Sequence, residues 1–249
     1  MSREPVYAAL SGLVRAIAFT QGLRITYRGT ENIPREGGAV IAVNHTGYLD
    51  FMQVGLVARQ GKRHVRYMMK KELERNPIVG FLMRHCKAIG VDREAGAESY
   101  AAAVASLRAG EVVCVYPEAT ISRSFELKRF KSGAARMALE ANVPIVPVAI
   151  WGAQRIMTKD IPKALGRNNF PIHITVGTPI GPHGTPDELT VELRTAMDAA
   201  LKCAQDGYEH PPSARWVPAR LGGTAPTPEA AAEIEEAELA ARRAARKSR

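Results

Sequence analysis

Cysteines, aromatic residues and long apolar runs are all scarce in this sequence, and each scarcity argues against a class of protein. Three cysteines are scattered over 249 residues without C-x-x-C spacing, which argues against a zinc site or disulfide framework and favours reduced thiols in a cytosolic setting. Aromatic residues make up 6% of the chain and are not interleaved with basic residues, as a base-stacking platform would need. No apolar run reaches the roughly 20 residues that span a bilayer, and no cleavable signal is readable.

Positive charge, in contrast, is abundant and concentrated. The formal net charge is +9 at pH 7, and the sequence pI is about 9.7. The segment from Arg59 to Arg93 contains ten Lys and Arg residues against three acidic ones. A localised positive field suits phosphate, nucleic acid or anionic lipid, and charge alone does not choose among them.

Apolar patterning alternates between short strands and helices. The strands are expected at Leu23–Arg28 (an edge strand), Ala39–Val43, Val65–Met69, Ala88–Val91, Val112–Tyr116, Val143–Ile150 and Ile172–Val176. The helices are expected at Pro5–Thr20, from Asp50 onward, at Lys71–Arg84 with interruptions at Pro77 and Gly80, and at Glu94–Ala109, Ser132–Ala141 and Pro186–Ala204. This alternation predicts an α/β fold with a mixed, mainly parallel sheet flanked by helices, and ligands beyond the carboxyl ends of the strands.

The chain divides into three predicted parts: an N-terminal helix (1–22), a catalytic domain (23–206), and a Pro/Gly-rich strap with a charged C-terminal helix (207–249). The first helix either packs on the domain or lies in a membrane interface with Arg15 reaching the headgroups. In the strap, Trp216 is the expected large anchor. The final helix places acidic residues before basic ones, in agreement with the helix dipole. It is either a solvated helix or a basic end that touches a membrane.

The segment from Asn44 to Asp50 carries the strongest chemical signal. A buried strand ends in His45, Gly47 allows a tight turn, and Asp50 begins the next helix. An imidazole takes up a proton near neutral pH, and a carboxylate on its other ring nitrogen fixes the tautomer and stabilises the imidazolium. Taken alone, His45 is more often a satisfied loop histidine and Asp50 a helix cap. Their place after a central strand favours a catalytic pair.

A second polar segment follows the strand that ends at Tyr116. It offers Glu118, Thr120 and Arg123, with further basic residues close behind. A guanidinium binds phosphate through paired donors, which makes Arg123 a candidate phosphate ligand. The alternative is a solvated basic loop.

Two more basic residues lie where the sheet is expected to place ligands. Lys70 follows the third predicted strand, and Arg93 follows the fourth. Both are candidates for the same crevice, although Arg93 is also able to form a surface ion pair with Asp92 or Glu94, which would stabilise the protein little.

Taken together, these segments resemble the glycerolipid acyltransferase family, specifically the bacterial type of 1-acylglycerol-3-phosphate (lysophosphatidate) acyltransferases. That family has four sequence blocks, in this order: NHxxxxD, a block ending in Arg, PEGTR and a Pro-containing strand. The segments of this chain that look like these blocks are Asn44–Asp50, Gly90–Arg93, Pro117–Arg123 and Val143–Pro147. The resemblance covers about Leu23–Gly181.

One of these blocks departs from the family pattern. Where the family has Glu-Gly-Thr-Arg, this chain has Glu118-Ala119-Thr120-Ile121, and Arg123 lies two residues later. The guanidinium would then come from a reshaped loop. Alanine also disfavours positive φ, so the turn at Ala119 is expected to differ from the family's.

The resemblance implies direct acyl transfer to the sn-2 hydroxyl of 1-acylglycerol-3-phosphate, with His45 as base and Asp50 as its orienting partner. It implies that Lys70, Arg93 and Arg123 hold the acceptor phosphate, that Glu118 and Thr120 shape the pocket, and that acyl-CoA or acyl-carrier protein is the co-substrate. No metal or other cofactor is expected. The enzyme is expected to bind peripherally at the cytoplasmic face of the membrane.

Three alternatives remain open at this point. The same His/Asp mechanism serves glycerol-3-phosphate or another lyso-lipid as acceptor. Two alternatives from other classes are a nucleic-acid-binding α/β protein, for which the aromatic pattern is unfavourable, and a membrane adaptor without catalysis. The preferred acyl chain, the carrier and the oligomeric state are not determined by these patterns.

Overall fold

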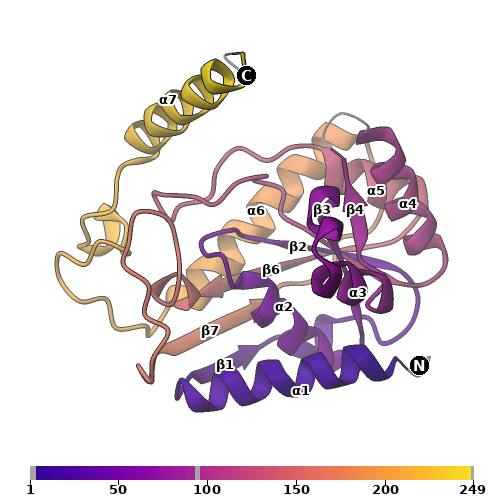
Figure 1. The fold of residues 1–249 in the computed structure, drawn as a ribbon, viewed down its shortest axis with the longest axis horizontal. Coiled ribbons are helices and arrows are strands. Elements are labelled where there is room, and N and C mark those ends of the chain that lie inside the picture. The colour runs from indigo at the N-terminus through magenta and orange to yellow at the C-terminus, as the bar shows by residue number, and fades with distance from the viewer. Residues whose placement is uncertain (1–3, 93–95, 248–249) are drawn as a thin grey trace.

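Strands that are buried at every position lie in the middle of a seven-stranded sheet (Figure 1). A computed structural model describes residues 4–92 and 96–247 of the chain. β2 (Ala39–Val43) is buried at all five positions, as is β6 (Ile145–Trp151) at all seven. Strands covered on both faces need apolar side chains at every position, which explains their continuous apolar runs.

The sheet has the order β1-β7-β6-β2-β5-β3-β4. The remaining strands are β1 (Arg24–Arg28), β3 (Val65–Lys70), β4 (Ile89–Val91), β5 (Val112–Val115) and β7 (Pro171–Val176). All neighbouring strands run parallel except β6 and β7, which are antiparallel. The predicted mixed, mainly parallel sheet is therefore confirmed, with β1 at an edge.

Helices cover the two faces of the sheet differently. The described helices are α1 (Pro5–Thr20), α2 (Asp50–Ala58), α3 (Pro77–His85), α4 (Gly96–Arg108), α5 (Gly133–Ala141), α6 (Pro186–Gln205) and α7 (Pro228–Lys247). Val40 and Ala42 of β2 face the core shared with α4, α5 and α6, whereas Ile41 and Val43 face the core shared with α2. Each buried Val or Ile side chain contributes about 1.5–3 kcal/mol, so this alternation fixes β2 between the layers.

The segment predicted as one interrupted helix from 71 to 84 is instead two elements. A 3₁₀ turn spans Lys71–Arg75, and α3 begins at Pro77. Asn76 caps α3 because its side-chain oxygen accepts hydrogen bonds from the backbone amides of Ile78 and Val79, at 3.0 and 3.2 Å. Proline is well suited to the first position of a helix, so Pro77 starts a helix here rather than bending one.

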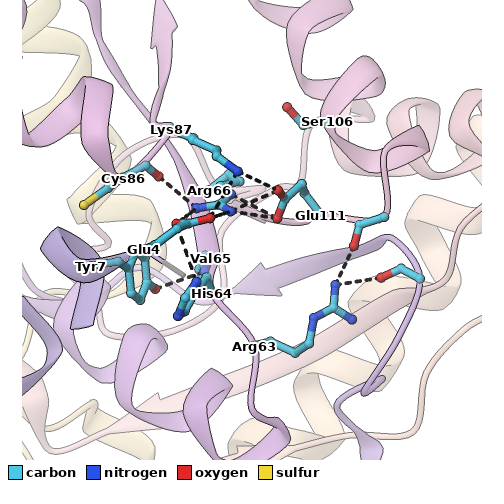
Figure 2. Close-up of polar contacts among 12 residues, drawn as sticks. Glu4, Tyr7, Arg63, His64, Val65, Arg66, Cys86, Lys87, Ser106 and Glu111 are labelled. Atoms are coloured by element: carbon cyan, nitrogen blue, oxygen red, sulfur yellow. Dashed lines mark hydrogen bonds and ion pairs between the residues drawn. The ribbon is translucent and has the colours of Figure 1, made fainter. Parts of the chain in front are cut away.

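The N-terminal end of α1 is anchored to β3 by a cluster of charged side chains (Figure 2). Arg66 donates hydrogen bonds to the carboxylates of Glu4 and Glu111, with closest distances of 2.5 and 2.9 Å. Burial opposes the charge of Arg66, but the hydrogen bonds to the two carboxylates outweigh it and raise the guanidinium pKa. The Tyr7 hydroxyl accepts a hydrogen bond from the amide of Val65 at 2.9 Å. α1 therefore begins at a fixed point on the sheet.

α1 continues from this anchor along one side of the molecule, and α7 lies at the opposite side (Figure 1). Tyr7 and Ala18 are the buried residues of α1, whereas Leu13 and Phe19 are 55% and 79% exposed. Among the described residues, no helix is both long and apolar enough to cross a membrane.

The segment before α7 packs on the end of β6 through more than the single anchor expected from the sequence. The rings of Trp216 and Tyr208 lie 6.5 and 6.4 Å from that of Trp151, and the Trp151 indole donates a hydrogen bond to His210 at 3.0 Å. Arg155 lies 4.6 Å above the Trp216 ring. These contacts carry the chain across the domain to the start of α7.

Candidate active site

The loop after β2 brings His45 and Asp50 into contact at the carboxyl end of the central strand. His45 Nδ1 lies 3.0 Å from Asp50 Oδ2. The Asp50 side chain is fully buried, whereas that of His45 is 21% exposed. The structure therefore brings together the two residues predicted as base and partner, with the carboxylate inside and the imidazole accessible.

Three hydrogen bonds fix the position of the Asp50 carboxylate. Besides the imidazole, Oδ2 accepts hydrogen bonds from the backbone amides of Thr46 and Gly47, both at 2.9 Å. Asp50 is also the first residue of α2, where the helix dipole favours negative charge. A Cβ at Gly47 would lie 3.1 Å from Asp50 Oδ1 and from the carbonyl oxygen of Met157. A side chain at this position would thus press on the Asp50 carboxylate and on the neighbouring backbone.

The imidazole is held from a second side by Tyr116, at the end of β5. Their ring centroids lie 4.2 Å apart with an angle of 26° between the planes. Because the Asp50 carboxylate accepts a hydrogen bond from Nδ1–H, Nε2 is the ring nitrogen that remains to accept a proton from another molecule. Burial raises the pKa of Tyr116 well above its ordinary value, so this phenol stays neutral.

Asn44 has a structural role that the sequence did not reveal. Its side chain donates a hydrogen bond to the carbonyl of Ile150 at 3.0 Å and accepts one from the Ile150 amide at 2.7 Å. It thereby continues the pairing of β2 with β6 by one step, immediately before His45. A polar residue at the end of an apolar strand was the available signal.

Glu118 joins the His45 loop to the loop after β5. Its carboxylate accepts hydrogen bonds from the backbone amides of His45 and Lys128, at 2.8 and 3.0 Å. Burial raises its pKa to about 7, even though these two amides and the charges of His45 and Lys128 favour the ionised form. Glu118 thus connects the two loops through their backbone amides.

The turn after Glu118 keeps a left-handed residue despite its alanine. Ala119 has a φ of 62°, a conformation that costs a residue with a Cβ roughly 1–2 kcal/mol. Ala119 therefore adopts a positive φ even though alanine disfavours it. The hydrogen bond between the Ala119 amide and the Tyr116 carbonyl, 3.0 Å long, closes the turn.

Arg123 and Thr120 belong to the segment beside the His45 loop, and their side chains bind carboxylates of other segments. The backbone amide of Ser122 donates to the His45 carbonyl at 2.8 Å, which places this segment against the loop. The Arg123 guanidinium pairs with Asp160 at 2.5 Å and with Glu238 of α7. The Thr120 hydroxyl donates to Glu235 of α7 at 3.0 Å.

The other two predicted phosphate ligands are not joined to this group. Lys70 is exposed at the carboxyl end of β3, two strands from β2 in the sheet order. Arg93 lies outside the described residues. Lys159, which sequence reasoning did not single out, lies closer: its ammonium group donates to the carbonyl of Ile121 at 3.4 Å. A lone lysine between strands carries no signal that would have identified it.

The arrangement suits removal of a proton from a bound hydroxyl. His45 is oriented by a buried carboxylate and a stacked ring, and cationic side chains for an anionic group lie on the adjacent loop. A base of this kind acts on any hydroxyl that reaches Nε2 within hydrogen-bond distance.

Comparison with known proteins gives this geometry a family. The family model described as Acyltransferase matches residues 24–151. A 1-acyl-sn-glycerol-3-phosphate acyltransferase of Bacillus subtilis is 36% identical over 123 residues, which are 49% of this chain and 60% of that protein. A probable 1-acyl-sn-glycerol-3-phosphate acyltransferase of Mycoplasma pneumoniae is 29% identical over 180 residues, 68% of this chain and 66% of that protein. The chain thus spans less than two thirds of the length of these relatives.

A solved structure has the same fold. The crystal structure of the 1-acyl-sn-glycerophosphate (LPA) acyltransferase PlsC from Thermotoga maritima superimposes with a TM-score of 0.69. The match covers 82% of this chain and 81% of that chain, at 19% sequence identity. The likeness therefore extends well beyond the residues of the family model.

Proposed function

Because this chain belongs to the Acyltransferase family, we propose that it transfers a fatty acyl group to the free sn-2 hydroxyl of 1-acylglycerol-3-phosphate and so forms phosphatidic acid. The observation that carries the proposal is the 3.0 Å contact between His45 Nδ1 and buried Asp50. The names of the Bacillus and Mycoplasma relatives support the choice of acceptor.

In the proposed mechanism, His45 Nε2 removes the proton of the acceptor hydroxyl as its oxygen attacks the thioester carbonyl. Asp50 stabilises the imidazolium that forms, and the tetrahedral intermediate then breaks its C–S bond. The imidazolium returns the proton to the departing thiolate, which leaves as a free thiol. No covalent enzyme intermediate is needed.

We assign the acyl donor to acyl-CoA or acyl-carrier protein, since both present a thioester on an anionic carrier. The basic segment from Arg59 to Lys87 supports this assignment by its charge. Lys70, at the end of β3, belongs to this segment. Arg93 remains a candidate phosphate ligand by its family block alone.

We further propose that the protein binds peripherally to the cytoplasmic face of the membrane through α1, α2 and α3. α1 contacts both α2 and α3, and these helices expose the large apolar side chains of Leu13, Phe19, Phe51, Ile78 and Phe81. Exposed basic residues lie on α3 and in the segment before it, at Lys70, Lys71, Arg75 and Arg84. Apolar groups bordered by cations suit an anionic lipid surface.

Substitution of Phe19 and Ile78 by Asp tests the membrane surface, because these are the two most exposed apolar side chains in it, at 79% and 70%. The double variant is expected to lose most of its sedimentation with anionic vesicles. Val191→Asp is the matched control, since Val191 is 67% exposed on α6, which covers the other face of the sheet. Equal sedimentation of both variants would contradict this surface.

The catalytic assignment is tested by His45→Ala, for which a fall in kcat of about 100- to 10,000-fold is expected from loss of the general base. Asp50→Asn should leave a small residual rate. His183→Ala, which removes an exposed histidine just before α6, is the control. Activity of His45→Ala near that of the control would exclude His45 as the base.

A panel of acceptors decides the substrate. Glycerol-3-phosphate and other lyso-lipids are the alternative acceptors, because the same base acts on any hydroxyl held at Nε2. Radiolabelled acyl-CoAs of graded length, offered with each acceptor and followed by positional analysis of the product, are expected to show the highest kcat/KM with lysophosphatidate. A higher value with glycerol-3-phosphate would replace the proposed acceptor.

A further inference from the structure

Three basic side chains from two loops converge beside the His45 loop. Arg123 and Lys128 belong to the loop after β5, and Lys159 to the loop after β6. Both loops contact the segment 45–48: the Ser122 amide donates to the His45 carbonyl at 2.8 Å, and the Tyr48 amide donates to the Met157 carbonyl at 2.9 Å. We call these three residues the cation cluster.

The cation cluster is crowded with positive charge. Burial, followed by repulsion from Arg123, lowers the pKa of Lys159. The Arg123 side chain is 4% exposed, and its Nη1 is buried without a hydrogen-bond partner among the described residues. A buried guanidinium nitrogen with no acceptor is costly, so an anionic ligand that reached this nitrogen would be stabilised by it.

Carboxylates of α7 occupy the cluster. Glu235 pairs with Lys128 at 2.5 Å and with Lys159 at 3.6 Å, and Glu238 pairs with Arg123. The two glutamates are three residues apart, so they lie on the same face of the helix. These contacts bring α7 to the loops at the carboxyl ends of the strands, while its C-terminal end extends away from the domain (Figure 1).

A carboxylate and a phosphate bind to the same kinds of side chain. Both bind guanidinium and ammonium groups through charge-assisted hydrogen bonds to oxygen. The carboxylates of Glu235 and Glu238 therefore bind the cation cluster as the oxygens of a phosphate would. Nη1 of Arg123 remains available to a further oxygen atom. The Thr120 hydroxyl also binds Glu235, at 3.0 Å.

We propose that the cation cluster, including Lys159, binds the phosphate of the acceptor, and that Glu235 and Glu238 of α7 occupy it as an internal competitor until the acceptor displaces them. The inference rests on the proposed function, since it names the residues that receive the acceptor's phosphate. It assigns a binding role to Lys159, which lies outside the four motif blocks, and a regulatory role to α7.

Occupation of the cation cluster by α7 reduces the apparent affinity of the protein for its acceptor. A ligand that binds only the open form has an apparent Kd equal to its intrinsic Kd divided by the open fraction. Loss of the two carboxylates should therefore lower KM for the acceptor, whereas loss of a cation should raise it. Neither change should alter the chemistry at His45.

The first experiment compares Glu235→Gln/Glu238→Gln with Glu233→Gln/Glu236→Gln. Both pairs remove two negative charges from α7, but Glu233 and Glu236 are exposed. With lysophosphatidate as acceptor, the first variant is expected to lower KM by about 3- to 10-fold with kcat unchanged. The control should keep the wild-type KM. Equal KM values for both variants would overturn the competition.

The second experiment tests whether Lys159 binds the acceptor phosphate. Lys159→Ala is expected to raise KM for lysophosphatidate by about 10-fold, the effect of one lost charge-assisted contact. Lys163→Ala, in the exposed part of the same loop, should not change it. An unchanged KM for Lys159→Ala would remove this residue from the phosphate site.

A third experiment needs no catalysis. Hydrogen exchange of the amides in 228–247 is measured in the full-length protein with glycerol-3-phosphate and, as a control, with glycerol. Faster exchange of α7 with glycerol-3-phosphate alone is expected, because the phosphate displaces the helix. If it appears without acyl transfer to any acceptor, the anion site stands and the proposed function fails. If acyl transfer occurs but exchange is unchanged, the function stands and this inference is overturned.

Discussion

Both ends of the chain are attached to the domain by glutamates bound to an arginine, but the two attachments differ in burial. At the N-terminal end, Arg66 and Glu4 have side chains 2% and 6% exposed. At the C-terminal end, Arg123 is 4% exposed, but its partners Asp160 and Glu238 are 60% and 40% exposed. The same pair of residue types therefore forms a closed cluster at α1 and an accessible one at α7.

This difference decides which contact is permanent. Separating a fully buried pair leaves charges that water cannot reach, whereas carboxylates at the surface are rehydrated as soon as they leave. α1 is therefore expected to stay attached in the folded protein. α7 is the end of the chain that an anionic ligand is able to displace.

The largest expected effect is at Arg66. Arg66→Met leaves Glu4 and Glu111 without their common cation and should lower the free energy of unfolding by about 3–5 kcal/mol. Arg108→Met is the control, because Arg108 pairs with Glu140 at 3.9 Å with both side chains about half exposed. Urea unfolding of both variants measures the difference. A loss at Arg66 no greater than at Arg108 would remove the distinction between the two ends.

Glu118 offers a second test, because it is a buried carboxylate bound to backbone amides rather than to a cation. The folded protein retains its proton up to about pH 7, whereas the unfolded chain releases it near the ordinary value of 4.5. The unfolded state thus binds fewer protons in this window, so this group lowers the free energy of unfolding as pH rises from 4.5 to 7. The contribution is on the order of 2–3 kcal/mol.

Urea unfolding of the wild type and Glu118→Gln at pH 5 and pH 7 measures this contribution. The variant lacks the ionisable group, so its stability should fall less than that of the wild type between the two pH values. A parallel change in both proteins would show that Glu118 is ionised throughout the range.

The smallest expected effect is at α7. Glu235→Gln/Glu238→Gln should lower the free energy of unfolding by less than about 1 kcal/mol, because partly exposed ion pairs contribute little. The same urea experiment measures it beside Arg66→Met. A loss as large as that of Arg66→Met would mean that α7 is a structural part of the domain rather than a displaceable segment.

Much of the fold was predictable because its signals are local. The continuous apolar runs at Ala39–Val43 and Val112–Tyr116 identified central strands, and the predicted start of α2 at Asp50 is confirmed. The prediction was wrong for the segment 71–84, in which Pro77 was expected to interrupt a helix. A helix begins at Pro77 instead. Proline is compatible with both positions, and only the Asn76 cap distinguishes them.

The sequence by itself determined the sheet, the family resemblance and the pairing of His45 with Asp50, since motif spacing and apolar period are properties of neighbouring residues. Only the tertiary structure decided what surrounds that pair. Arg123 pairs with Glu238, 115 residues away along the chain, and Lys128 and Lys159 pair with Glu235. No local sequence pattern predicts these contacts. Ion pairs depend on distance in space and on burial, both of which folding sets.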